Sequence, residues 1–222
     1  RTLFAGETLN RRDIPTLAEY FHLNSEHYAL RFKPPGPIQL FYGPSLLKPA
    51  VLDLISRHFD GVILQTLYGI GDMEASLSRL DSARANSGAR EPLRKVMLLN
   101  ASISRDSEAA RQHAKRFVSH IVSGWPDEAL AAKGIDPKAI QAVRQAYAEN
   151  RGVDYASALT PDEAVDRLII AGNPDQCIDR LRELFSLAVR HGFGEIAIGV
   201  PLGPDVPEAI DLWGQEILPA LR

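Results

Sequence analysis

The stretch from Pro37 to Gln65 constrains the fold more than any other part of the chain, because two short apolar runs flank one amphipathic segment. The first run, Ile38 to Tyr42, predicts a buried strand. Pro49 then suits the first position of a helix, where its missing N–H has no partner to lose. The apolar residues of that helix fall on one stripe: Val51, Leu52, Leu54, Ile55 and Phe59. With the second run, Val62 to Leu64, this order predicts a right-handed parallel strand–helix–strand unit.

The loop from Gly43 to Lys48 connects the first of these strands to the helix. In parallel sheets and barrels, ligands bind at the carboxyl ends of the strands, where this loop lies. It also leads into a helix N-terminus, which carries unpaired N–H groups and the positive end of the dipole. Lys48 adds a full positive charge. Two interpretations remain open: a site for phosphate or another anion, and an ordinary loop with Lys48 in solvent.

Composition limits the classes of protein to consider. The 222 residues, 45% of them hydrophobic, can build one sizeable core, and the net charge of −3 gives no basic surface for nucleic acid. No apolar run is long enough to span a membrane, and no signal peptide is visible. We therefore expect a soluble cytoplasmic protein with neither a nucleic acid nor a membrane as partner. The chain begins with Arg1 instead of Met, which allows for a missing or processed front end.

Further strand–helix pairs follow along the chain. Strands are predicted at Lys95 to Ile103 and Glu195 to Val200. A capping box at Thr160 to Glu163 begins a helix that is predicted to end at Gly172. The intervening segment, residues 124–160, interrupts the alternation and is interpreted as a helical insertion, a lid or a subunit contact within a single domain covering 1–222.

The chain offers few groups for catalysis or metal binding. Cys177 is the only cysteine, and it lies on the apolar stripe of a helix, so we interpret it as a core residue and not as a nucleophile. His113 and His120 lie seven residues apart without a third ligand, so no metal site is predicted. Gln65 and Thr66 follow the second strand and offer hydrogen-bonding groups. Four strands alone leave two open edges, so either the chain is half of a barrel or a partner completes it, and a homo-oligomer is expected.

The ordered segments PIQLFYG, DGVIL, AGNPDQCIDRLREL, GEIAIGVPLGPD and WGQEILPALR resemble the luciferase-like flavin-dependent oxidoreductases. Within that superfamily, IVSGWPDEALAAKGID and LGPDVPEAIDLWGQEILP are most similar to the methylenetetrahydromethanopterin reductase branch. The resemblance implies an α/β fold of the TIM (β/α)8-barrel type. This chain would supply about strands five to eight, with the insertion after strand seven.

The same resemblance implies a cofactor and a set of contacts. The family's phosphate-binding loop falls on Gly43, Pro44, Ser45, Leu46, Leu47 and Lys48, and its contacts after strand six fall on Gln65 and Thr66. This loop is longer than is usual in the family. No catalytic residue is assigned. In the family, the groups that act near the reacting ring lie largely on the first strands of the barrel, and the resemblance does not cover those strands.

Three functions follow from these observations. The first is hydride transfer between reduced coenzyme F420 and a small pterin-like substrate, with the cofactor carrying the difficult step. The second is an FMN-dependent luciferase-like monooxygenase. The third is a non-catalytic half-barrel that binds a flavin or dimerises through its open sheet.

Overall fold

The computed structural model describes residues 1–222 except for residues 21, 23, 45–47, 66–69, 90 and 222. Internal contacts divide the chain into two compact units, Arg1–Leu40 and Phe41–Arg222. The expectation of a single domain over 1–222 stays a prediction.

The first unit is small and contains short elements only. They are a 3-10 helix at Leu3–Ala5, strand β1 at Leu9–Asn10, a 3-10 helix at Arg11–Asp13, helix α1 at Pro15–Tyr20 and strand β2 at His27–Tyr28. Strands β1 and β2 pair antiparallel, with Leu9 opposite Tyr28. The first 3-10 helix ends at Gly6, whose φ of 82° is in the left-handed region that glycine adopts without a Cβ penalty.

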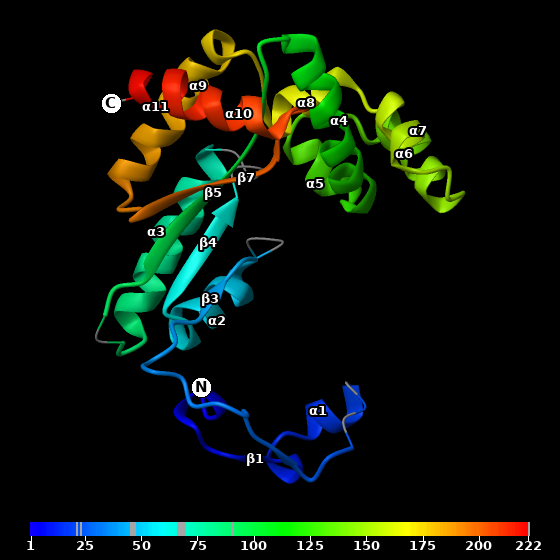
Figure 1. The fold of residues 1–222 in the computed structure, drawn as a ribbon. Coiled ribbons are helices and arrows are strands. Elements are labelled where there is room, and N and C mark those ends of the chain that lie inside the picture. The colour runs from blue at the N-terminus through cyan, green and yellow to red at the C-terminus, as the bar shows by residue number, and fades with distance from the viewer. Residues whose placement is uncertain (21, 23, 45–47, 66–69, 90, 222) are drawn as a thin grey trace. The chain divides into compact units, whose positions relative to one another are not determined.

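The second unit is built on a parallel sheet (Figure 1). Within the described residues five strands form it: β3 (Phe41–Tyr42), β4 (Gly61–Gln65), β5 (Arg94–Ile103), β6 (Ile170–Gly172) and β7 (Glu195–Leu202). Strand β5 is the centre, since it pairs with β4, β6 and β7. All of these pairings are parallel. The predicted α/β class is confirmed, and β4, β5 and β7 lie where strands are expected. The buried strand expected over Ile38 to Tyr42 is shorter, because only Phe41 and Tyr42 pair with β4; both are partly buried, and Ile38 is 39% exposed.

Strand β6 corrects one prediction. The helix that begins after Thr160 was expected to run to Gly172, but α8 ends at Leu168 and Ile169 is already extended, with φ −138° and ψ 155°. Arg180 gives the physical reason, because its Nη1 donates to the carbonyls of Asp166 at 2.9 Å and Ile169 at 3.0 Å. These bonds satisfy carbonyls at the end of the helix and release the backbone to pair with β5.

Helices cover the sheet and pack around two cores. They are α2 (Pro49–His58), α3 (Ile70–Asn86), α4 (Ser107–Gly124), α5 (Asp127–Ala132), a 3-10 helix (Pro137–Ile140), α6 (Gln141–Ala148), α7 (Val153–Ala158), α8 (Asp162–Leu168), α9 (Pro174–Arg190), α10 (Val206–Leu212), a π-helical turn (Trp213–Ile217) and α11 (Leu218–Ala220). The first core joins one face of β4 and β5 to α2, α3 and α9, with Leu64, Leu77, Met97 and Leu181 fully buried. The second core lies among α4 to α8.

The capping box predicted at Thr160 to Glu163 does not form: Pro161 is the N-cap of α8 without a side-chain cap bond, and the Thr160 hydroxyl donates to the Ala156 carbonyl at 3.0 Å. The starts of two other helices have clear local causes. Pro49 occupies the first position of α2. Helix α9 has a capping box, in which the Asn173 side chain accepts from the Gln176 N–H and the Gln176 side chain accepts from the Asn173 N–H. Local sequence therefore determines where α2 and α9 begin.

The segment 124–160 is helical and packs on α4 (Figure 1). Ser119 and Tyr147 share a hydrogen bond of 2.9 Å, and Arg116 pairs with Asp154. These contacts join α4 to α6 and α7. A role as lid or subunit contact stays a prediction.

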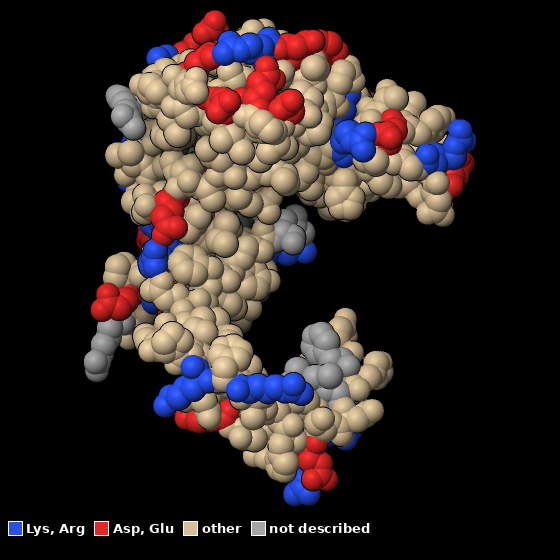
Figure 2. All heavy atoms as spheres, viewed as in Figure 1, with Lys and Arg blue, Asp and Glu red and all other residues tan. Residues whose placement is uncertain are grey.

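None of the described helices combines the length and the apolar character needed to cross a bilayer. On the face drawn in Figure 2, basic and acidic side chains are interspersed over the helices in the upper part of the view. This mixture agrees with the small net charge of −3.

Candidate cofactor-binding site

The candidate site lies where β3 and β4 end and α2 begins. Of the loop from Gly43 to Lys48, the structure describes Gly43, Pro44 and Lys48, and residues 45–47 lie outside the described residues. Gln65 is the last residue of β4, and Thr66 also lies outside the described part. Strands β3 and β4 are parallel, with Tyr42 opposite Val62. Gly43 and Gln65 therefore lie at the same edge of the sheet, as the sequence predicts.

Lys48 stands at the N-cap of α2 in an extended conformation, with φ −75° and ψ 146°. Its side chain cannot accept a hydrogen bond, so it cannot cap the helix as Asp106 caps α4. The N–H groups of Val51 and Leu52 both donate to the Lys48 carbonyl, at 3.0 and 3.1 Å. Pro49 has no N–H, which leaves the Ala50 N–H without an acceptor among the described residues.

The Lys48 ammonium is also available to a ligand. Lys48 is exposed and makes no ion pair with any described residue. Gly43 is exposed too, and a Cβ at its position would meet nothing within 4 Å. An exposed ammonium and a backbone N–H, both without a partner among the described residues, therefore lie at the positive end of α2, which suits an anion.

Gln65 contributes a neutral polar group to the same edge. Val62 and Leu64 of β4 are fully buried in the first core, so the alternation of the strand turns Gln65 to the opposite face of the sheet. Its side chain is partly buried and has no hydrogen-bond partner in the described part of the chain. An unpartnered amide in this position can donate to or accept from a bound molecule.

A second polar residue lies on the same face of the sheet as Gln65, and the sequence prediction misses it. Asn100 of β5 is only 2% exposed, and its Nδ2 donates to the carbonyl of Val200 on β7 at 2.8 Å. The one signal in the sequence is a single asparagine inside the apolar run from Lys95 to Ile103. Its partner lies a hundred residues away, and no local pattern identifies it.

Cys177 lies in the first core, and burial raises the pKa of its thiol to about 11. A thiol with so high a pKa is almost entirely protonated near neutral pH and is a poor nucleophile. The interpretation of Cys177 as a core residue is therefore confirmed. Among the residues that the structure describes, no three His, Cys, Asp or Glu side chains come together as a metal-holding group.

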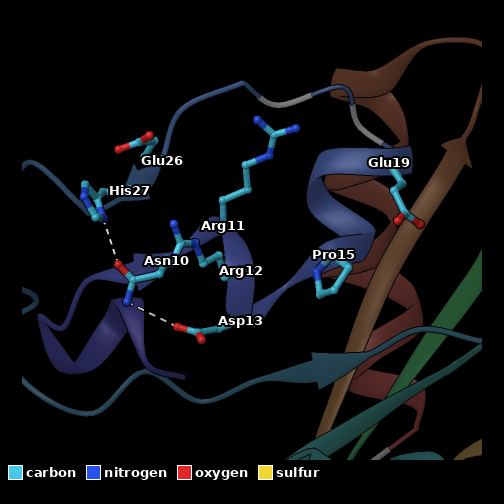
Figure 3. Close-up of a pocket in the computed structure, with 8 residues that line it drawn as sticks. All are labelled: Asn10, Arg11, Arg12, Asp13, Pro15, Glu19, Glu26 and His27. Atoms are coloured by element: carbon cyan, nitrogen blue, oxygen red, sulfur yellow. Dashed lines mark hydrogen bonds between the residues drawn. The ribbon is translucent and has the colours of Figure 1, made fainter.

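The first unit contains a polar cavity of its own, of about 800 Å³ (Figure 3). Its lining carries both signs of charge: Arg11 and Arg12 are cationic, and Glu19 and Glu26 are anionic. In Figure 3 the Arg11 side chain lies between Glu26 and Glu19, and His27 bonds to Asn10 at 2.7 Å. Because the charges are mixed, this cavity has no net preference for an anion.

These features define a class of protein: a parallel α/β fold with a candidate anion site at the carboxyl ends of its strands. The family model of the luciferase-like monooxygenases matches residues 6–191, and the chain belongs to this family. The fold is accordingly of the TIM-barrel type, and the chain spans about half the length of the relatives that it matches.

Three individual proteins of known function are similar to this chain. A 5,10-methylenetetrahydromethanopterin reductase from Archaeoglobus fulgidus is 32% identical over 198 residues, which are 87% of this chain and 57% of the relative. An F420-dependent glucose-6-phosphate dehydrogenase from Nakamurella multipartita is 27% identical over 86% of this chain and 50% of its own length. The structure of the coenzyme F420-dependent tetrahydromethanopterin reductase from Methanopyrus kandleri superimposes with a TM-score of 0.68 and 25% identity, covering 83% of this chain and 51% of that one.

Proposed function

We propose that the chain belongs to an oxidoreductase that uses coenzyme F420 and acts on a small, pterin-like substrate. The observation that carries this proposal is the 32% identity to a 5,10-methylenetetrahydromethanopterin reductase over 87% of the chain. Coenzyme F420 is named for two of the relatives described above. When bound, the deazaflavin would supply or accept the hydride.

The described residues fit such a cofactor. The Lys48 ammonium and the Ala50 N–H, neither of which has a partner in the described part of the chain, would hold the phosphate of the cofactor. Gln65 would hold a polar group closer to the ring. The proposed contacts of Ser45, Leu46, Leu47 and Thr66 concern residues that the structure does not describe.

A second candidate is an FMN-dependent monooxygenase, because the matching family is named for luciferase-like monooxygenases. FMN also carries a phosphate, so Lys48 and the N-terminus of α2 do not discriminate between the two cofactors. The difference lies in the reaction, since a monooxygenase consumes oxygen and an F420-dependent reductase does not. A homo-oligomer and a lid role for residues 124–160 belong to either proposal.

The cofactor is tested by titrating the purified chain with F420 and, separately, with FMN, following the fluorescence of each. Saturable binding of F420 that is tighter than binding of FMN supports the first candidate. Tighter binding of FMN, with oxygen consumption when a flavin reductase is added, would replace it by the second. Binding of neither molecule would leave a non-catalytic half-barrel, and size-exclusion chromatography with light scattering would then test dimerisation through the sheet.

A further inference from the structure

Strand β7 contains a bulge beside Asn100. In the pairing of β5 with β7, Asn100 lies opposite Gly199 and Ser102 lies opposite Leu202. Strand β5 advances two residues between these pairs while β7 advances three, so Val200 and Pro201 share the space of one residue. Pro201 cannot donate to the ladder. Within the bulge, the carbonyl of Val200 accepts a hydrogen bond from the Asn100 Nδ2 at 2.8 Å.

The backbone after the bulge is held in an unusual conformation. Leu202 has a φ of 60°, which is uncommon for a residue with a Cβ, and the Gly203 N–H donates to the Pro201 carbonyl at 2.7 Å. A Cβ on Gly203 would lie 2.2 Å from the carbonyl oxygen of Ile103, so only glycine fits there. Backbone strain of this kind persists where surrounding contacts hold it, and it occurs often at ligand sites.

The bulge changes what β7 presents to its surroundings. Ile196 and Ile198 of the same strand are partly buried against the first core, but the Val200 side chain is 60% exposed. Val200 is near the carboxyl end of β7, and that end of a parallel strand is where ligands bind in this fold (Figure 1). An exposed isopropyl group at such a place can pack against the flat face of a ring.

We infer that Asn100 is a positioning residue, whose bond to the Val200 carbonyl fixes the bulge of β7 so that the Val200 side chain contacts the ring of a bound cofactor. The inference rests on the proposed function, since it places a flavin-type ring at the carboxyl ends of the parallel strands. Asn100 itself acts through Val200. Its amide is buried at 2% exposure, so the cofactor contact is made by Val200 and not by Asn100.

A merely structural role for Asn100 makes a different prediction, and Ser102→Ala provides the matched control. Ser102 is fully buried on the same strand, and its hydroxyl donates to the Ala110 carbonyl at 2.8 Å, on helix α4 and away from β7. Asn100→Leu and Ser102→Ala each remove a hydrogen bond from a buried side chain to a carbonyl. If Asn100 only stabilises the fold, both variants lose stability and neither changes cofactor binding.

The experiment compares dissociation constants of F420 and FMN for the whole chain and both variants, with urea unfolding of each. We expect Asn100→Leu to weaken binding of the preferred cofactor roughly tenfold and Ser102→Ala to leave it within about twofold of the unchanged chain. Equal binding by all three proteins would overturn the inference and leave the proposed function standing. An unchanged chain that binds neither cofactor would overturn both.

A second pair of variants covers the case in which Asn100→Leu does not fold. Val200→Thr changes an exposed side chain, and Val189→Thr makes the same change at a valine of α9 that is 81% exposed. We expect Val200→Thr alone to weaken binding, by about threefold to tenfold, since a polar group replaces an apolar ring contact. Equal affinities for the two threonine variants would overturn the assignment of Val200.

Discussion

Lys115 on α4 donates to the carboxylate of Asp162 on α8 at 2.8 Å, although the Lys115 side chain is only 11% exposed and the Asp162 side chain is 66% exposed. Arg111, one turn earlier on α4, pairs with Asp166, one turn later on α8, at 2.6 Å. The two pairs form a ladder that joins the helices antiparallel. The hydrogen bond from Lys115 is the main cause that holds the pKa of Asp162 below its ordinary value of 3.8.

This ladder predicts a dependence of stability on pH. Because the pKa of Asp162 is lowered by folding, its contribution is present above pH 3.8 and is lost as the pH falls through the folded-state value. Asp162→Asn should lower the free energy of unfolding at pH 7 by about 0.5–1 kcal/mol, a small value because the carboxylate is largely in solvent. Urea unfolding at pH 7 and pH 3 should show the difference shrink at the lower pH. Asp211→Asn, at an exposed acid that pairs with no described residue, should show no difference at either pH.

Arg84 of α3 binds both the end of α2 and the loop before β5. Its Nη1 donates to the carbonyls of Ser56 at 2.8 Å and Phe59 at 3.1 Å, and its Nε donates to the carbonyl of Glu91 at 2.9 Å. Arg84→Met should lower the free energy of unfolding by about 1–3 kcal/mol, because these carbonyls lose a charged donor. Thermal and urea unfolding measure the effect. Arg79→Met, on the same helix and without a partner among the described residues, should change it by less than about 0.5 kcal/mol, and equal losses would contradict the role of Arg84.

The parts of the fold that were predicted correctly are those that local pattern determines. The apolar runs of β4, β5 and β7 identify strands, and Pro49 begins a helix where the sequence indicates. Strand β6 was not predicted, because Ile169 to Gly172 continues the apolar content of the preceding helix. Its release from the helix depends on Arg180, which is distant in sequence.

Prediction of the site divides in the same way. Lys48 is found from the sequence because a strand, a loop and a proline-initiated helix place it at a strand end. Asp106 is the N-cap of α4, and the Ser104 hydroxyl before it donates to the Glu208 carboxylate of α10 at 2.9 Å, across a hundred residues of sequence. The bond of Asn100 to Val200 likewise joins two strands a hundred residues apart. Contacts that close only in the folded chain leave no periodic signal.

Cys177 predicts how the chain responds to thiol reagents and to substitution. Since its thiol is buried and its pKa is raised to about 11, Ellman's reagent should label the folded chain slowly and the urea-unfolded chain at once. Cys177→Ser should lower the free energy of unfolding by about 1–3 kcal/mol, because a hydroxyl then replaces the thiol in an apolar core. Cofactor binding by the folded serine variant should be unchanged. Rapid labelling of the folded chain would contradict the burial of this residue.

Lys48 gives the most direct test of the anion site. Lys48→Ala should weaken binding of F420 or FMN by about 1–2 kcal/mol, roughly five- to thirtyfold, if the ammonium meets the cofactor phosphate. The free energy of unfolding should stay the same, because Lys48 is exposed and pairs with no described residue. Riboflavin, which lacks the phosphate, should bind equally well to both proteins. Lys138→Ala removes another exposed lysine, from the insertion, and controls for net charge. An unchanged dissociation constant for Lys48→Ala, or an equal loss for Lys138→Ala, would contradict a phosphate contact and favour the interpretation of the loop as an ordinary connection.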